Sequence, residues 1–289
     1  MDKLLTVVLG PTAVGKTDYA IELAKKWGSP VISCDSRQIF KEMRIGTAPP
    51  SPQQLQEVRH YFIFSHSVAS YYSAGQYELD AMALLTRLFK EHDRLVMVGG
   101  SGLYADALCY GLDDFPPADQ ELRAKLTRRA LEEGVGVLAD ELREVDPESW
   151  ATLDLSNRQR VVRALEVTLS TGRKFSSFKT RPRKARPFAI ERVCLTMPRE
   201  ELYARIDRRA EKMFEDGLVD EVRSLSRYRE MPALRTVGYK EVFEYLDGKM
   251  SLDEAVWLVK RNTRRYAKRQ VTYFASVEKK VSSPLLRET

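Results

Sequence analysis

The sequence feature that most constrains this chain is a glycine-rich loop at residues 10–17, which reads G-P-T-A-V-G-K-T. The apolar run L-L-T-V-V-L at residues 4–9 precedes the loop and is typical of a buried parallel strand. Helix-period apolar residues follow the loop as far as Trp27. A strand, this loop and a helix, in that order, form a phosphate-binding loop (P-loop), because the backbone N–H groups and the helix N-terminus face an anion. The loop therefore predicts polyphosphate binding and leaves the reaction open.

Two side chains of the P-loop have further predicted roles. Lys16 adds a positive charge, and the Thr17 hydroxyl suits a Mg²⁺ ion bound next to phosphates. The alternative interpretation is a glycine-rich turn with an exposed lysine. The strand and the helix on either side of the loop disfavour that alternative.

The rest of the chain alternates strand-like and helical patterns, which is typical of a parallel α/β sheet. We expect strands at residues 30–34, 60–64, 94–98 and 190–197. From residue 117 to residue 186 only helical patterns occur, and this segment ends in a basic run. We therefore predict a P-loop NTPase-like core of residues 1–116 and 187–289, with a parallel sheet flanked by helices. Residues 117–186 are expected to form a helical, basic insertion.

Cysteine spacing and hydropathy exclude several classes of protein. The three cysteines, Cys34, Cys109 and Cys194, lie far apart and have no histidine at metal spacing. This favours reduced thiols and argues against a disulfide framework or a zinc site. The only N-terminal apolar run is too short for a signal peptide or a membrane span, so we expect a soluble cytoplasmic protein without a membrane partner.

Three polar residues follow predicted strands, at the edge where parallel sheets bind ligands. Asp35 can act as a general base, hold Mg²⁺ or merely cap a turn. Gln38 can pair with a purine edge, because an amide both donates and accepts hydrogen bonds. Ser101 offers a hydroxyl within G-G-S-G, a second strand–glycine–helix pattern. P-loop ATPases and GTPases commonly have a metal-binding Asp at the end of such a strand, so this loop argues against hydrolysis-driven motor work.

Basic residues form two further candidate surfaces. Arg158, Arg160 and Arg163 lie at the start of a predicted helix in the insertion, before a basic run that begins at Arg173. The predicted helix at residues 252–277 carries six basic residues on one half of its circumference, namely Lys260, Arg261, Arg264, Arg265, Lys268 and Arg269. An unopposed basic face favours a nucleic-acid backbone as its partner, and a merely solvated face is the alternative.

Together these motifs resemble the bacterial tRNA dimethylallyltransferases, also called tRNA isopentenyltransferases. The resemblance runs almost from end to end and rests on the order and spacing of short motifs. They are the P-loop, D-S-R-Q at 35–38, G-T-A at 46–48, Y-S-A-G-Q-Y at 72–77, G-G-S-G-L-Y at 99–104, N-R-Q-R-V-V-R-A-L-E-V at 157–167, Arg209, Met213, G-L-V-D-E-V at 217–222, V-G-Y-K-E at 237–241 and A-K-R-Q at 267–270.

The resemblance implies transfer of a dimethylallyl group from dimethylallyl diphosphate to N6 of the adenosine immediately 3′ of the tRNA anticodon, with Mg²⁺ as cofactor. It implies catalytic roles for Asp35, Ser101 and Lys16, with Asp35 accepting the N6 proton. The implied diphosphate-binding residues are Gly10, Pro11, Thr12, Ala13, Val14, Gly15, Lys16, Thr17 and Arg209, with Thr17 as the metal ligand. The implied tRNA-binding residues are Asp35, Ser36, Arg37, Gln38, Ser101, Arg123, Gln159, Arg160, Val161, Val162 and Arg163. We expect the enzyme to be a monomer.

The chain departs from the family pattern at two positions. Ser101 stands where the family usually has Thr, which keeps the hydroxyl, and Tyr273 stands where the family commonly has Trp. Three other functions compete with the one implied. A P-loop small-molecule kinase and a prenyltransferase of free adenine nucleotides need no broad basic surface. A nucleic-acid-binding protein with a purely structural P-loop would leave Asp35, Gln38 and Ser101 without a role at the sheet edge.

Overall fold

The computed structural model describes residues 3–180, 183–277 and 279–283, and the chain divides into two compact units. Unit 1 comprises Met1–Tyr110 and Ala185–Thr289, and unit 2 comprises Gly111–Lys184. Unit 2 corresponds to the helical insertion predicted at residues 117–186. Its observed limits lie slightly earlier in the chain, at Gly111 and Lys184.

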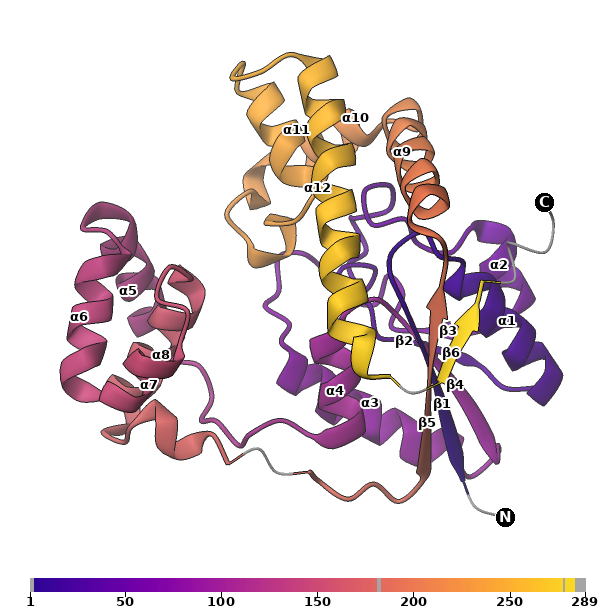
Figure 1. Cartoon of the computed structure of the whole chain (residues 1–289), viewed down its shortest axis with the longest axis horizontal. Coiled ribbons are helices and arrows are strands. Elements are labelled where there is room, and N and C mark those ends of the chain that lie inside the picture. The colour runs from indigo at the N-terminus through magenta and orange to yellow at the C-terminus, as the bar shows by residue number, and fades with distance from the viewer. Residues whose placement is uncertain (1–2, 181–182, 278, 284–289) are drawn as a thin grey trace. The chain divides into compact units, whose positions relative to one another are not determined.

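Unit 1 is built on a six-stranded sheet with the strand order β3-β2-β4-β1-β5-β6 (Figure 1). The strands are β1 (Leu4–Leu9), β2 (Val31–Ser33), β3 (His60–Tyr61), β4 (Arg94–Val98), β5 (Ala189–Thr196) and β6 (Lys279–Ser282). All the pairings between neighbouring strands are parallel. The apolar run before the P-loop forms β1, between β4 and β5, which explains why it is almost wholly buried. The predicted parallel α/β core is confirmed.

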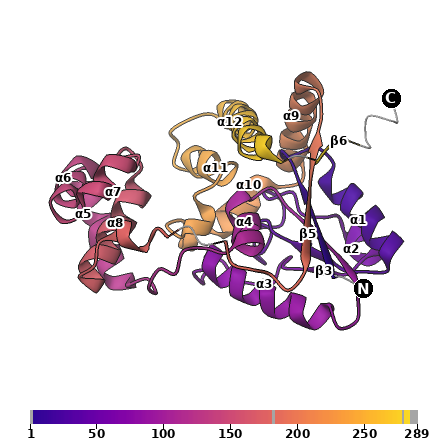
Figure 2. The ribbon, with the colours of Figure 1, turned by 60° about the horizontal axis from the view of Figure 1, so that its bottom comes forward.

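Helices cover both faces of the sheet (Figure 2). One face carries α1 (Lys16–Trp27), and the other carries α3 (Ala74–Leu88) and α4 (Gly102–Tyr110). The short helix α2 (Pro52–Glu57) precedes β3. A further helical layer lies beyond the carboxyl ends of the central strands (Figure 1), and it consists of α9 (Arg199–Glu215), α10 (Leu218–Ser224), η2 (Ser226–Tyr228), η3 (Pro232–Leu234), α11 (Tyr239–Leu246), α12 (Leu252–Tyr273) and η4 (Phe274–Ser276).

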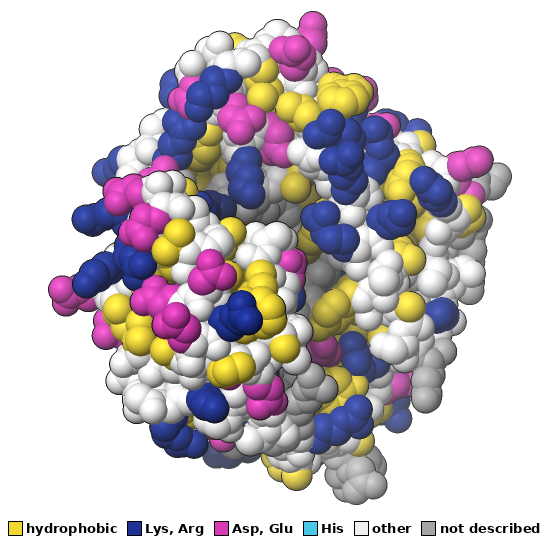
Figure 3. Space-filling model, turned by 60° about the vertical axis from the view of Figure 1, so that its left-hand side comes forward, with side chains coloured by type: hydrophobic (Ala, Val, Ile, Leu, Met, Phe, Trp, Pro, Cys, Tyr) yellow, Lys and Arg dark blue, Asp and Glu magenta, His cyan; other side chains and the backbone are white. Residues whose placement is uncertain are grey.

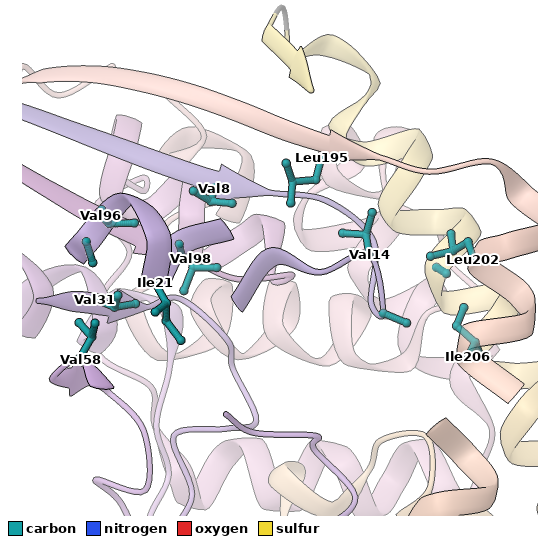
Figure 4. Close-up of a cluster of buried hydrophobic side chains, with 14 residues drawn as sticks. Val8, Val14, Ile21, Val31, Val58, Val96, Val98, Leu195, Leu202 and Ile206 are labelled. Atoms are coloured by element: carbon teal, nitrogen blue, oxygen red, sulfur yellow. The ribbon is translucent and has the colours of Figure 1, made fainter. Parts of the chain in front are cut away.

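The P-loop packs against a buried hydrophobic cluster of unit 1 (Figure 4). It joins side chains of the sheet and α1, including Val8, Val96 and Ile21, to side chains of α9. Val14 belongs to the P-loop itself, is fully buried, and lies between Leu195 and Leu202. Burial of one valine side chain stabilises a fold by about 1.5–3 kcal/mol. One apolar residue of the P-loop therefore anchors the loop to the core.

Unit 2 is a helical bundle with a core of its own. Its elements are α5 (Gln120–Glu132), α6 (Val135–Val145), α7 (Pro147–Thr152), α8 (Arg158–Thr171) and η1 (Phe175–Phe178). Leu126, Leu138, Leu142 and Leu165 are among its most deeply buried side chains. Within α5 the cluster members Leu122, Leu126 and Ala130 recur every four residues, and within α6 Leu138 and Leu142 do the same, so each of these helices turns one apolar face inward.

Two strands differ from the sequence prediction. The third strand was expected at residues 60–64 but ends at Tyr61, because Phe62 and Phe64 adopt positive φ angles of 62° and 50°. Strand β6 was not predicted, since K-K-V-S contains only one apolar residue. Among the described residues, no helix is both long enough and apolar enough to cross a membrane.

Candidate active site

A pocket of about 480 Å³ lies in unit 1, where the chain leaves β1, β2 and β4 and faces α9 and α12. This is the crevice at the carboxyl ends of strands in which parallel α/β sheets bind ligands. The structure brings together here most of the residues that the sequence predicted for the core, namely Thr12, Ala13, Gly15, Lys16, Thr17, Asp35, Ser36, Arg37, Gln38, Ser101 and Arg209.

The three remaining P-loop residues, Gly10, Pro11 and Val14, shape the loop and are not among the residues that line the pocket. Gly10 has a φ of 142°, and a Cβ atom there would stand 2.8 Å from the carbonyl oxygen of Leu195, so no other residue fits. The carbonyl oxygen of Pro11 accepts a hydrogen bond of 2.6 Å from Lys16 Nζ. Val14 fills the core beneath the loop.

Three basic side chains gather at the P-loop, and none of them has a carboxylate partner among the residues that the structure describes. Burial, and then the charge of Arg209, lower the pKa of Lys16 to about 8. Burial, and then the charge of Arg205, lower the pKa of Arg209. Arg209 donates to Thr12 Oγ1 at 3.3 Å, and Arg205 Nε donates to the carbonyl oxygen of Ala13 at 2.9 Å. A bound anion would relieve the repulsion between these partly buried like charges, so the arrangement suits a di- or polyphosphate.

Asp35 organises the turn that follows β2. Its Oδ1 atom accepts hydrogen bonds from the backbone N–H groups of Arg37 at 2.8 Å and Gln38 at 3.2 Å. Ser101 Oγ accepts from the Ser36 N–H and donates to Ser36 Oγ, both at 3.0 Å. These contacts need only a hydroxyl, which Ser101 supplies as well as a threonine would. Asp35 is therefore both a turn cap and a pocket carboxylate, two roles that the sequence left as alternatives.

The amide of Gln38 has a defined orientation. Its Nε2 atom donates to the carbonyl oxygens of Thr47 at 3.2 Å and Ala48 at 2.9 Å. An amide NH₂ has two hydrogens, so these two acceptors use both of them. Gln38 thus retains only the acceptor Oε1 for a ligand, whereas the sequence had suggested that the amide both donates and accepts.

Glu221, from the G-L-V-D-E-V motif, holds the segment that leads to Thr47. Its carboxylate accepts from the backbone N–H groups of Arg44, Ile45 and Gly46 at 2.7–3.0 Å and from the Tyr239 hydroxyl at 2.6 Å. Sequence reasoning named this motif without giving Glu221 a role. Four donors converging on one carboxylate show that the glutamate fixes the loop opposite Gln38.

Two further pocket residues were missed as site residues. Arg205 lies four positions before Arg209 on α9, so the two share one helix face, and that spacing was the available signal. Gln270 belongs to the A-K-R-Q motif and is only 5% exposed, although its helix has a basic surface. The sequence pattern around Gln270 does not predict that this side chain is buried.

The residues at the end of the P-loop can hold the expected Mg²⁺ only if substrate phosphates and waters supply the other ligands. Among the described residues, no three His, Cys, Asp or Glu side chains form a metal-binding group. Thr17 lines the pocket beside Lys16 and Asp18. Mg²⁺ commonly takes one or two protein ligands together with substrate phosphates and waters. The donor set present is compatible with that mode of binding and not with an all-protein cage.

In unit 2 the residues predicted to contact tRNA fall into three groups. Gln159 and Arg160 are exposed. Val161 and Val162 are buried in the helical core, so their side chains cannot reach a surface ligand. Arg123 and Arg163 form ion pairs of 2.7 Å with opposite oxygens of Glu166, whose side chain is fully buried.

The basic face predicted for the long C-terminal helix is partly neutralised. Arg264 pairs with Asp207 and Lys260 pairs with Glu211, both acids on α9, so the prediction of an unopposed face was wrong for these two residues. Arg265, Lys268 and Arg269 are exposed and have no ion-pair partner among the described residues. On the face drawn in Figure 3, acidic and basic side chains are mixed over one part of the surface, whereas elsewhere several basic side chains lie together.

The basic run at residues 173–186 is also largely engaged. Lys184 pairs with Asp114, and Arg186 forms a buried ion pair of 2.8 Å with Glu78. Arg173 and Lys179 lie over the rings of Phe178 and Phe175. Arg181, another member of the run, lies outside the described residues. Acidic partners that are distant in sequence, and aromatic rings within five residues, thus account for several of the charges that the sequence shows as unopposed.

The Tyr that replaces the family's usual Trp has a specific place. The ring of Tyr273 lies so close to Gly102 that a Cβ atom on this glycine would stand 2.1 Å from it. The hydroxyl donates to Asp106 on α4. Tyrosine therefore supplies the end of α12 with a hydrogen bond to α4 as well as a packing surface.

Comparison with known proteins identifies the family. Residues 38–277 match the model of the family described as IPP transferase. A tRNA dimethylallyltransferase of Cytophaga hutchinsonii is 49% identical over 275 residues, which cover 95% of this chain and 90% of that protein. The tRNA dimethylallyltransferase 1 of Bacteroides thetaiotaomicron is 47% identical over 270 residues, which cover 93% and 88%.

A solved structure agrees with this result. The full-length tRNA isopentenylpyrophosphate transferase from Bacillus halodurans matches 98% of this chain and 89% of its own, with a TM-score of 0.69 and 36% identity. The match covers both the P-loop core and the helical insertion. Neither a kinase nor a free-nucleotide prenyltransferase is among these relatives. The resemblance predicted from the sequence is thereby confirmed, and the chain belongs to the IPP transferase family, whose members are transferases.

Proposed function

We propose that this protein transfers a dimethylallyl group from dimethylallyl diphosphate to N6 of the adenosine immediately 3′ of the anticodon in tRNA. The names of its relatives support the activity. The observation that carries the proposal is that one pocket is lined both by the basic P-loop and by Asp35 with Gln38. The reaction needs positive charge for the diphosphate leaving group and hydrogen-bond acceptors for the amine, both within a single cavity.

The donor's diphosphate would bind at the P-loop. Lys16, Arg209 and Arg205 supply positive charge, and the loop and the N-terminus of α1 supply backbone N–H groups. As the bond between the allylic carbon and oxygen breaks, negative charge grows on the departing diphosphate, and these fixed groups stabilise it. Mg²⁺, with Thr17 as a ligand, would neutralise part of the same charge.

The acceptor adenine would bind at the Asp35 turn. A base that reacts at N6 must leave its stack, which costs a few kcal/mol. The N6 amino group donates hydrogen bonds, and Gln38 offers it only an acceptor. A bond forms between N6 and the allylic carbon as the carbon–oxygen bond breaks, and the displaced N6 proton passes to the Asp35 carboxylate. Ser101 holds the Asp35 turn through Ser36.

The tRNA backbone would contact exposed basic residues that have no ion-pair partner among the described residues. Our candidates among these residues are Arg160 in unit 2, with Gln159 beside it, and Arg265, Lys268 and Arg269 in unit 1. Phosphate contacts of this kind supply most of the affinity of nucleic-acid-binding proteins and make binding depend on salt. We expect a cytoplasmic monomer with no membrane partner.

The decisive experiment is one incubation with radiolabelled dimethylallyl diphosphate, Mg²⁺ and either unmodified tRNA or AMP, with labelled ATP run in parallel. Label in tRNA but not in AMP is the expected result. Label in AMP alone would keep the chemistry and change the substrate. Phosphate transfer from ATP without prenyl transfer would overturn the proposal in favour of a kinase.

A further inference from the structure

Gln270 is a buried amide at the end of a helix whose neighbouring residues face water. It is 5% exposed, whereas Arg269, Val271 and Thr272 on the same turn of α12 are exposed. A glutamine side chain is rarely buried unless its polar atoms are bonded. The bonds that it makes therefore indicate what the residue does.

Both ends of the amide are bonded to catalytic loops. Gln270 Oε1 accepts from the backbone N–H of Thr12 at 2.8 Å, and Nε2 donates to the carbonyl oxygen of Gly100 at 2.8 Å. An N–H group can bond only the oxygen and a carbonyl only the nitrogen, so the orientation of the amide is unambiguous. One side chain thus joins the P-loop to the loop that follows β4, across 258 and 170 residues of sequence.

The glycines of the second loop accommodate this link. A Cβ atom on Gly100 would stand 2.4 Å from Gln270 Nε2, and one on Gly102 would meet the Tyr273 ring. A Cβ atom on Gly99 would stand 2.5 Å from Cys34 Sγ. G-G-S-G is a second strand–glycine–helix pattern in the sequence. In the structure these glycines instead admit the last turn of α12 and the end of β2.

We propose that Gln270 is a positioning residue that sets the separation between the diphosphate site and the base-binding turn. On one side it fixes Thr12, whose hydroxyl bonds Arg209. On the other side it fixes Gly100, next to Ser101, whose hydroxyl bonds the Ser36 N–H beside Asp35. The chain of contacts runs from the leaving-group site to the proton acceptor. The inference rests on the proposed function, because it concerns the alignment of donor and acceptor.

Two single substitutions and their combination test the link. Gln270→Ala removes both hydrogen bonds, and Gly100→Ala forces the amide away from the Gly100 carbonyl by steric contact. We expect each single variant to lower kcat by about 10- to 100-fold, the effect of a misplacement near 1 Å. The double variant should be no worse than either single one, because Gln270→Ala also clears the space that the new methyl group needs. Affinity for tRNA should stay within about twofold, since neither residue carries charge.

Matched controls separate positioning from folding. Gln270→Met fills about the same volume without hydrogen bonds and should reproduce the loss of kcat. It leaves the Thr12 N–H and the Gly100 carbonyl unpaired, so its melting temperature should fall by several degrees, and kcat is compared below that transition, where the variant is folded. Thr272→Val changes an exposed residue of the same turn and should leave kcat unchanged. A wild-type kcat in Gln270→Met, or single effects that multiply in the double variant, would overturn the inference. Failure of the natural protein to prenylate tRNA would instead overturn the proposed function.

Discussion

Basic residues serve opposite purposes in the pocket of unit 1 and in the helical unit 2. Lys16 and Arg209 are half-buried beside the P-loop without an ion-pair partner among the described residues, and their pKa values are lowered. Arg123 and Arg163 each hold one oxygen of the buried Glu166. The sequence suggested ligand contact for all four. The comparison teaches that partly buried cations that lack a carboxylate partner and line a pocket mark a ligand site, whereas a cation paired with a buried carboxylate stabilises the fold.

The largest effect on kcat is expected at Asp35, the pocket carboxylate that is proposed to accept the N6 proton. Asp35→Asn keeps an oxygen that can accept from the Arg37 and Gln38 N–H groups but removes the proton acceptor. We expect kcat to fall by about two to four orders of magnitude, the usual range for a general base, with tRNA affinity nearly unchanged. Single-turnover prenylation measures the first quantity and filter binding the second. A rate near that of the natural protein would remove Asp35 from the mechanism.

Lys16→Met tests whether the basic residues of the pocket serve the ligand and not the fold. Loss of its charge should lower kcat by about 10²- to 10³-fold, because less negative charge on the leaving diphosphate is stabilised. The melting temperature should rise, since burial lowers the pKa of Lys16 and the charged form therefore costs folding free energy. Lys26→Met, an exposed lysine of the same helix, is the control for both measurements. A fall in melting temperature would show that Lys16 is structural, as the arginines of unit 2 are.

In unit 2 we expect the opposite effect on stability: combining Arg123→Ala with Arg163→Ala should destabilise the fold. The change leaves Glu166 buried with only the Asp119 N–H as a hydrogen-bond donor, and it should destabilise unit 2 by about 3 kcal/mol. Hydrogen exchange in peptides of α8, within the full chain, reports this loss. Arg129→Ala on α5 breaks only partly exposed pairs with Glu133 and Glu141 and should cost less than about 1 kcal/mol. Equal effects of the two changes would mean that Glu166 is no structural centre.

The lowered pKa of Lys16 also predicts how donor binding depends on pH. Below a pH of about 8 the free protein keeps the ammonium that attracts diphosphate, and above it the proton is lost. Affinity for dimethylallyl diphosphate without tRNA should therefore fall above pH 8, by at most about tenfold per unit. Calorimetry should show proton uptake on binding in the same range. The Lys16→Met variant should show neither effect, and a flat profile in the natural protein would exclude Lys16 as the titrating group.

The sequence predicted what depends on local pattern and missed what depends on distant partners. The P-loop, the apolar run of β1 and the long helix α12 were recognisable because periodicity and glycine spacing are local. The ion pairs of Lys260 and Arg264 lie outside such a pattern, since Glu211 and Asp207 are 49 and 57 residues upstream. The same holds for Gln270 and its two loops. The burial of Val161 and Val162 is a different kind of miss, because local helical spacing buries them within a motif that resembled a contact surface as a whole.

The smallest effect distinguishes a tRNA contact from a structural arginine within one helix. Arg160 is exposed and forms no ion pair among the described residues, whereas Arg163 binds Glu166 one turn later. Arg160→Ala should weaken tRNA binding a few-fold and reduce the slope of log affinity against log salt by about one, without lowering kcat at saturating tRNA. Gln159→Ala is the uncharged control on the same turn and should keep the slope. If Arg160→Ala also keeps the slope, Arg160 is not a phosphate contact. The phosphate contacts would then be expected from Arg265, Lys268 and Arg269 on α12. Substituting these three residues should reduce the salt dependence of tRNA binding that Arg160→Ala left unchanged.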